Sequence, residues 1–397
     1  MRKPVALVAL SLLAAACADP GRDPVAPNRP IPNAPSADVA AGPGEVAVAG
    51  QVIPDEYIVV LKASATSIIG RTAIAHGIGV TPRLTYSVIN GFAAHMTAAQ
   101  AAVLAQNPNV EYVEPDQEMS IETTQTGATW GLDRIDQRAL PLSGTYTYTK
   151  TGTGIHAYII DTGIQTSHPD FGGRASVAFD ATGGNGQDCN GHGTHVAGTV
   201  GGTRWGVAKG VTLHAVRVLN CSGSGTTSGV IAGVDWVRTH AVKPAVANMS
   251  LGGGASTALN TAVNNLANSG VFLAVAAGNS NANACSSSPS GASAVYAVAA
   301  SSSTDARASF SNFGSCVKVY APGVSVTSDW LSGGTNTISG TSMASPHVAG
   351  VAALYKSNFG DASSATVGSW ITANATTNVI TGNPAGTPNR LLYKGTL

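Results

Sequence analysis

Residues 340–350 read G-T-S-M-A-S-P-H-V-A-G and place Ser342 directly before an apolar run that predicts a helix. Serine is a favoured residue at the N-cap of a helix, so Ser342 could simply cap it. Alternatively, the positive end of the helix dipole and the free backbone N–H groups would stabilise an oxyanion beside a nucleophilic serine. Pro346 lies in an early turn, where a helix tolerates proline best. This window alone favours the capping interpretation.

The surrounding chain predicts an α/β fold. After Trp130, short and nearly unbroken apolar runs alternate with helical patterns, and such runs are typical of buried parallel strands. They cover residues 156–160, 213–218, 246–249, 271–276 and 317–320. We therefore expect a parallel β-sheet with helices on both faces, whose functional groups lie at the carboxyl ends of its strands.

Three other polar residues stand at the ends of predicted elements, each beside a glycine. Asp161 ends an apolar run, His192 lies between glycines in G-H-G-T-H-V-A-G, and Asn279 follows V-A-A-G. Each has a structural interpretation as a turn residue. His195 could form a metal pair with His192, but the spacing is three and no glutamate follows, so we interpret His195 as structural. Together with Ser342, the set predicts a nucleophile, a base, a carboxylate that orients it and an oxyanion donor.

Composition excludes some partners. The 397-residue chain has 21 Lys and Arg against 21 Asp and Glu, so it carries no net charge. Binding to nucleic acid or to an anionic membrane surface calls for a basic excess. We therefore expect no nucleic-acid partner.

The first 50 residues predict export. Residues 1–18 combine Arg2 and Lys3 with a short apolar run, which is typical of a signal peptide. Cleavage after the A-x-A pattern at 16–18 would remove Cys17. Residues 14–17 also resemble a bacterial lipobox, in which case Cys17 would give the precursor a transient lipid anchor. Residues 19–50 are a linker rich in Pro, Ala and Gly. An extracellular location follows.

Residues 51–122 predict a second, smaller α+β domain. Strand-like and helical patterns follow the order β-α-β-β-α-β, which is that of a ferredoxin-like unit. Thr97 and Gln100 form a capping-box pattern at the second helix. Residues 114–129 are polar and predict an exposed connector.

The four remaining cysteines, Cys189, Cys221, Cys285 and Cys316, predict two disulfides in an exported chain, with three pairings open. Zinc is the alternative, but no C-x-x-C pair is present.

From Trp130 to Tyr393 the chain resembles the subtilisin-like serine proteases (subtilases), in particular the aqualysin-like enzymes of the proteinase K branch. The blocks around Asp161, His192 and Ser342 carry this resemblance, and residues 130–137, 184–195, 228–237 and 247–254 support it. It implies a subtilisin-like catalytic domain over residues 123–397. It also implies an inhibitor-type propeptide over 51–122, which acts as an intramolecular inhibitor and chaperone and is cleaved near residues 122–124.

The resemblance assigns roles to the four polar residues. Ser342 would be the nucleophile, His192 the general base, Asp161 its orienting carboxylate and Asn279 an oxyanion donor. Protein and peptide substrates would bind as an added strand between two edges, and the S1 pocket, which takes the side chain before the cleaved bond (P1), would be roomy and uncharged. The edges are Gly223, Ser224 and Gly225 on one side and Ser250, Leu251, Gly252 and Gly253 on the other; Ala276, Ala277 and Gly278 would line S1. We expect a monomeric endopeptidase of broad specificity that prefers apolar or aromatic P1 residues.

The resemblance also implies the pairs Cys189–Cys221 and Cys285–Cys316, structural calcium at Asp133, Asp136 and Gln137, and no organic cofactor. Asp180 and Asp188 are candidates for another calcium site, whereas Lys318 replaces an aspartate that binds calcium in the family. The alternative interpretation of Asp133, Asp136 and Gln137 is a polar helix turn. The alternative functions are a non-catalytic binding module, an esterase and a peptide ligase. Reaction with a fluorophosphonate probe separates an enzyme from a binding module, and hydrolysis of casein compared with that of small esters separates the enzymes from one another.

Overall fold

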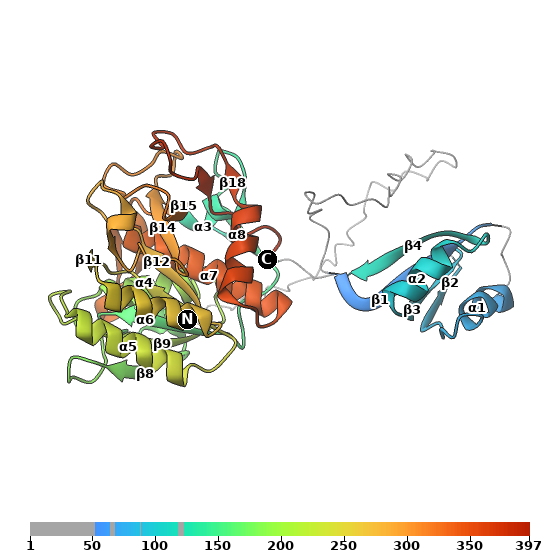
Figure 1. The fold of residues 1–397 in the computed structure, drawn as a ribbon, viewed down its shortest axis with the longest axis horizontal. Helices are drawn as coiled ribbons and strands as arrows, with labels where there is room; N and C mark the ends of the chain where they lie inside the picture. Colours follow the sequence, from blue (N-terminus) through green and yellow to red (C-terminus); the bar gives the residue numbers. More distant parts are fainter. Residues whose placement is uncertain (1–51, 64–67, 88, 118–122) are drawn as a thin grey trace, which may run out of the picture. The chain divides into compact units, whose positions relative to one another are not determined.

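The computed structural model describes residues 52–63, 68–87, 89–117 and 123–397 (Figure 1). The predictions for the signal peptide, for Cys17 and for the linker fall outside this range. None of the helices within it is long and apolar enough to cross a membrane.

The N-terminal domain has the predicted β-α-β-β-α-β order. Its elements are β1 (Val52–Leu61), α1 (Ile68–His76), β2 (Leu84–Tyr86), β3 (Gly91–His95), α2 (Ala98–Ala105) and β4 (Val110–Gln117). The antiparallel sheet has the order β2-β3-β1-β4, as a ferredoxin-like unit requires. The capping box at α2 is present, because Thr97 accepts a hydrogen bond from the backbone N–H of Gln100 while the Gln100 side chain accepts one from the N–H of Thr97.

The second domain is built on a nine-stranded sheet in the order β18-β19-β15-β14-β12-β10-β7-β9-β8. All neighbouring strands are parallel except β18 and β19. The strands are β7 (His156–Asp161), β8 (Ala175–Asp180), β9 (Thr212–Arg217), β10 (Ala245–Met249), β12 (Phe272–Ala276), β14 (Tyr296–Ser301), β15 (Val317–Pro322), β18 (Thr376–Thr377) and β19 (Arg390–Leu391). The predicted α/β fold is therefore confirmed.

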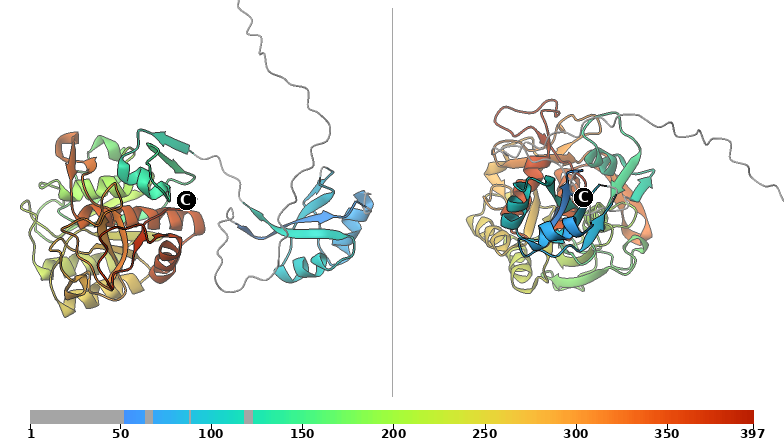
Figure 2. Two further views of the ribbon diagram at one scale, coloured as in Figure 1. Left: turned by 90° about the horizontal axis from the view of Figure 1, so that it is seen from above. Right: turned by 90° about the vertical axis from the view of Figure 1, so that its right-hand side faces the viewer.

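Helices cover both faces of this sheet (Figures 1 and 2). They are α3 (Trp130–Asp136), α4 (His192–Gly201), α5 (Thr227–His240), α6 (Thr257–Asn268), α7 (Thr341–Phe359) and α8 (Ser364–Asn374). Successive residues of β7 alternate between two cores. Ile159 packs in the core that includes residues of α4 and α7, whereas Ile160 packs in the core that includes residues of α5 and α6. Since strand side chains alternate between faces, burial on both sides explains the continuous apolar runs.

Several short elements lie outside the main sheet. They are β5 (Thr123–Thr126), β6 (Thr145–Tyr148), β11 (Gly253–Gly254), β13 (Ser287–Ser288), β16 (Val326–Asp329), β17 (Thr335–Ile338) and the 3₁₀ turns Pro169–Phe171, Ala284–Ser286 and Leu331–Gly333. The strand β5 lies within the predicted connector, and its residues are mostly exposed as expected, but its pairing was not predicted. It pairs with β6, in a register that places Gln125 opposite the buried Tyr146.

Candidate active site

Asp161 and His192 meet at the carboxyl edge of the sheet. Asp161 is the last residue of β7, and His192 is the first residue of α4. The Asp161 Oδ1 atom lies 2.7 Å from His192 Nδ1 and also accepts a hydrogen bond from the N–H of Thr162 at 2.8 Å. Burial lowers the pKa of His192, but the charge of Asp161 and its hydrogen bond outweigh burial, so the pKa is raised above 6.5. The imidazole therefore has a fixed ring orientation and a stabilised cationic form.

A buried aspartate that was expected to bind calcium joins these two elements. Asp188 accepts hydrogen bonds from the Thr162 hydroxyl, from the N–H groups of Asn190 and Gly191, and from both the N–H and the hydroxyl of Thr194. Five donors exhaust the lone pairs of one carboxylate. Asp188 thus holds the start of α4 against the end of β7, and its role as a calcium ligand stays a prediction.

Ser342 begins a helix without capping it. Gly340 is the N-cap of α7 and Ser342 is its second residue, so the capping interpretation is wrong. The Ser342 hydroxyl donates a hydrogen bond to the carbonyl of Ser250 at 3.2 Å. Within the described part of the chain it has no hydrogen bond to His192. Its position at the N-terminus of a 19-residue helix provides the favourable dipole that the sequence predicted.

Pro346 explains how the backbone of Ser342 is held. Proline has no N–H, so the carbonyl of Ser342 lacks the usual partner four residues later. The hydroxyl of Ser250 donates to this carbonyl at 2.7 Å and itself accepts a hydrogen bond from the side chain of Asn248 at 2.9 Å. Sequence reasoning placed Ser250 at the substrate edge and missed this second contact.

Asn279 is oriented by the residue that precedes Ser342. Its Oδ1 atom accepts hydrogen bonds from the N–H and the hydroxyl of Thr341, at 2.8 and 2.9 Å. The amide NH₂ group is therefore left as the free donor. The bend that places Asn279 here passes through Gly278, whose φ is +103°, and a side chain at Gly278 would collide with Asn312.

Two hollows flank these groups. One, of about 550 Å³, is lined by His192 and by residues 222–227 and 250–254, which include both predicted substrate edges, 223–225 and 250–253. The other, of about 370 Å³, is lined by residues 251–254, 276–280, 287–288, 290, 312, 341 and 342, none of which is charged. Ser342 and Asn279 thus share a hollow whose walls match the predicted S1 pocket.

His195 lies away from these hollows, in the core. It is fully buried and its Nε2 atom lies 3.1 Å from the carbonyl of Val326. Burial, the largest cause, lowers its pKa to about 4. A neutral, buried ring bonded to a backbone carbonyl supports the structural interpretation.

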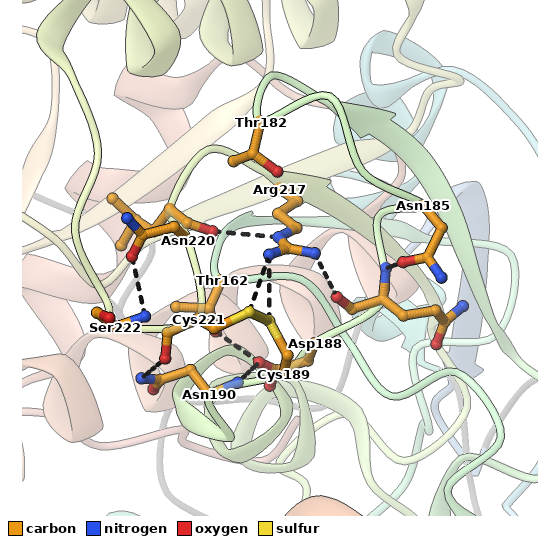
Figure 3. Close-up of a disulfide and its surroundings, with 12 residues drawn as sticks. Thr162, Thr182, Asn185, Asp188, Cys189, Asn190, Arg217, Asn220, Cys221 and Ser222 are labelled. Atoms are coloured by element: carbon orange, nitrogen blue, oxygen red, sulfur yellow. Dashed lines mark hydrogen bonds between the residues drawn. A yellow bond between two sulfur atoms is a disulfide. The ribbon is translucent and has the colours of Figure 1, made fainter.

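Both disulfides have the pairing that the resemblance implies, Cys189–Cys221 and Cys285–Cys316. The first links the loop before α4 to the loop after β9 (Figure 3). The guanidinium group of Arg217 lies beside this disulfide and donates to the carbonyl of Gln187 and to Cys189 Sγ, at 2.9 and 3.1 Å. The loop that precedes His192 is therefore fastened by a covalent bond and by a guanidinium group.

The three predicted calcium ligands are only partly brought together. Asp133 Oδ1 and Gln137 Oε1 both accept a hydrogen bond from the N–H of Ser143, at 3.2 and 3.1 Å, so these two oxygens converge. Asp136 instead lies 3.0 Å from Lys394 Nζ. No cluster of three or more His, Cys, Asp or Glu side chains suited to a metal occurs in the described ranges.

Asp180 and Lys318 also have defined surroundings. The Asp180 carboxylate accepts hydrogen bonds from the N–H groups of Thr182 and Gly186, at 2.6 and 2.7 Å. It thus closes its own loop. Lys318 lines a separate hollow of about 570 Å³ beside Tyr296.

A parallel sheet with an Asp–His pair at its edge and a serine at a helix N-terminus defines a serine hydrolase of the α/β class. The family model of the subtilase family matches residues 152–391, and that of peptidase inhibitor I9 matches residues 79–122. The chain belongs to the subtilase family. It is a serine protease with an inhibitor-type propeptide.

Named relatives agree. The extracellular serine proteinase of Thermus sp. (strain Rt41A) is 55% identical over 311 residues, which cover 77% of this chain and 76% of that protein. The alkaline serine exoprotease A of Vibrio alginolyticus is 50% identical over 77% of this chain and 58% of its own length. The crystal structure of a cold-adapted subtilisin-like serine proteinase matches with a TM-score of 0.67 and 52% identity, and covers 68% of this chain and 99% of that one.

Proposed function

We propose that Asp161, His192, Ser342 and Asn279 carry out peptide-bond hydrolysis. The Asp161–His192 hydrogen bond of 2.7 Å is the observation that carries this proposal, because it leaves Nε2 as the proton acceptor. Rotation of the Ser342 side chain away from the Ser250 carbonyl brings Oγ to that nitrogen. Oγ then attacks the peptide carbonyl while His192 takes its proton.

The tetrahedral intermediate places a negative charge beside α7. The Asn279 NH₂ group, oriented by Thr341, and the N–H of Ser342 donate to this oxyanion. His192 then returns its proton to the leaving amine, and water repeats the sequence on the acyl-enzyme. Asp161 remains ionised throughout and stabilises the imidazolium.

Substrate selection follows from the two hollows. An extended peptide adds as a strand between residues 223–225 and 250–253, whose exposed glycines allow close backbone approach. The uncharged 370 Å³ hollow takes an apolar or aromatic P1 side chain. Cleavage of a peptide library tests this, and a strict requirement for Arg or Lys at P1 would contradict it.

Maturation requires the same site. We infer that residues 51–122 fold as the intramolecular inhibitor, that the chain is cleaved near residues 122–124 and that residues 1–18 direct export. The variant Ser342→Ala should accumulate as an unprocessed precursor. Spontaneous processing of this variant in a protease-free translation system would rule out self-cleavage by Ser342.

Calcium is proposed for one site only. Asp133, Asp136 and Gln137 would hold it, because their oxygens are the donors that a hard cation prefers and two of them already converge. The ion would supply structural cross-linking of α3 to the loop at residue 143. Chelation with EDTA should lower the melting temperature of the wild type and leave that of Asp133→Asn unchanged; equal effects on both would contradict this site.

A further inference from the structure

Two carboxyl groups outside the catalytic site meet against α4, the helix that begins with His192. Asp170 lies in the 3₁₀ turn Pro169–Phe171, and Asp329 is the last residue of β16. Asp329 is fully buried. Among the described residues, neither oxygen of Asp329 has a hydrogen-bond partner, and neither does Asp170 Oδ2. A side-chain carbon at Gly202 would lie 2.3 Å from Asp170 Oδ2 and 3.0 Å from Asp329 Oδ2, so both oxygens converge on this glycine.

The nearest cation does not bond to either carboxyl group. Arg174 donates to the backbone carbonyls of Gly201, Val211 and Asp170, at 2.7, 2.9 and 3.2 Å, and to the Thr203 hydroxyl. It supplies one positive charge to a pocket that holds two acidic groups. The charge of Arg174 acts on both carboxyl groups and that of Lys209 acts on Asp170, so Asp329 has no cation of its own among the described residues.

Three other basic groups surround the pair. The Nδ1 atom of His168 accepts the N–H of Asp170 at 3.2 Å and its Nε2 faces the Gly334 carbonyl at 3.0 Å, so the proton lies on Nε2. Nδ1, 3.5 Å from Asp329 Oδ1, thus offers no hydrogen. His195 on α4 is neutral, since burial lowers its pKa to about 4. Lys209 donates to the carbonyls of Gly206 and Arg204 instead.

Two carboxylates whose buried oxygens converge do not both ionise readily, because each destabilises the charge of the other in a medium of low dielectric constant. We propose that Asp170 and Asp329 share one proton, and that this proton fastens the β16–β17 hairpin to the turn Pro169–Phe171 beside the C-terminal end of α4. Burial and the charge of Asp170 raise the pKa of Asp329 to about 8. The shared proton is thus held at neutral pH and lost in alkaline solution.

The residue after Asp329 connects this pair to the catalytic histidine. The indole ring of Trp330 packs on Gly191, where an added side-chain carbon would lie 2.4 Å from the ring. Gly191 is the N-cap of α4 and directly precedes His192. The same ring lies edge-on to His195, with 6.2 Å between the centroids. Repulsion between two ionised carboxylates would therefore displace the support of His192, and the pair positions the base rather than touching substrate.

The sign of the pH dependence follows from the raised pKa. The folded protein holds the proton up to about pH 8, whereas an unfolded aspartate releases it near its ordinary pKa of 3.8. The proton's contribution to the free energy of unfolding is greatest below the pKa of the unfolded state. It is lost as the pH rises through the pKa of Asp329 in the folded protein.

The test uses the mature enzyme inactivated by a sulfonyl fluoride, so that self-digestion does not contribute. In Asp329→Asn an amide N–H replaces the shared proton at every pH. Between pH 6 and pH 9 the melting temperature of the wild type should fall by about 5 °C more than that of this variant. Asp235→Asn, which removes an exposed carboxylate paired with Arg238, should follow the wild type. Parallel profiles for wild type and Asp329→Asn would overturn the proposal.

Three further measurements keep the result unambiguous. The infrared band of a protonated carboxyl group should be present in the wild type at pH 7 and disappear near pH 8. The same band should be absent from Asp170→Asn. Absence of the band from the wild type would overturn the proposal even if Asp329→Asn failed to fold. A rise in the wild-type melting temperature at pH 9 on addition of Ca²⁺ or Na⁺, without a rise in Asp329→Asn, would show a bound cation instead. A measurement on the active enzyme rests on the proposed function. There, kcat/KM of Asp329→Asn should decline less above pH 8 than kcat/KM of the wild type. The melting profiles do not depend on that function.

Discussion

The contact between Ser250 and the Ser342 carbonyl makes a quantitative prediction for stability. In Ser250→Ala the half-buried carbonyl of Ser342 loses the hydroxyl that donates to it, and Pro346 offers no N–H in its place. A buried polar group without a partner costs about 1–3 kcal/mol. The Ser342 carbonyl and the side-chain amide of Asn248 both lose their partner in this variant. With about 1 kcal/mol for each, the variant should unfold roughly 30-fold faster than the wild type if these contacts form after the transition state.

A second substitution distinguishes this explanation from a general packing defect. In Pro346→Ala the restored N–H can donate to the Ser342 carbonyl, as in a regular helix. Ser250→Ala in that background should then speed unfolding only about fivefold, because the lost partner of Asn248 remains a cost of about 1 kcal/mol. Unfolding rates of the sulfonylated proteins, followed by tryptophan fluorescence after a jump into denaturant, give both ratios. Equal ratios in the two backgrounds would refute the reasoning.

Other predictions concern the catalytic groups and the covalent framework. Asp161→Asn removes the charge that raises the pKa of His192. The acid limb of the pH profile of kcat/KM should therefore move to lower pH, while kcat falls about 10⁴-fold. An acid limb that stays in place argues against the pairing of Asp161 with His192. Asn279→Ala should lower kcat by about 10²–10³-fold with little change in KM, measured on a peptide anilide, and a loss confined to KM would assign Asn279 to ground-state binding. Replacing Cys189 and Cys221 by serine should destabilise the mature domain by about 3 kcal/mol, since they close a loop with a sequence separation of 32; an unchanged melting temperature would show that the loop is held by other contacts.

The catalytic groups could be predicted because their signals are local. Asp161, His192, Asn279 and Ser342 each lie at the end of an element and within two residues of a glycine, and a short window of sequence is enough to show this. The buried parallel strands were predictable for the same reason, since burial on both faces leaves a continuous apolar run. Residues 296–301, which form the inner strand β14, were missed because runs of alanine suit a helix as well as a strand.

The supports of the catalytic groups could not be predicted, because they depend on contacts between distant segments. Asp188 has the same appearance in the sequence whether it accepts N–H groups or binds calcium. Only the fold shows that five donors surround it. Likewise, the sequence does not show that Asp329 meets Asp170, which lies 159 positions earlier in the numbering.

The central claim is that Ser342 is a nucleophile activated by His192. Reaction of the mature enzyme with a fluorophosphonate, followed by peptide mapping in a mass spectrometer, tests it most directly. The wild type should carry one adduct, on Ser342, and His192→Ala should react at least about a hundredfold more slowly because general-base assistance is lost. An adduct on another residue, or equal labelling rates in the two proteins, would contradict the account.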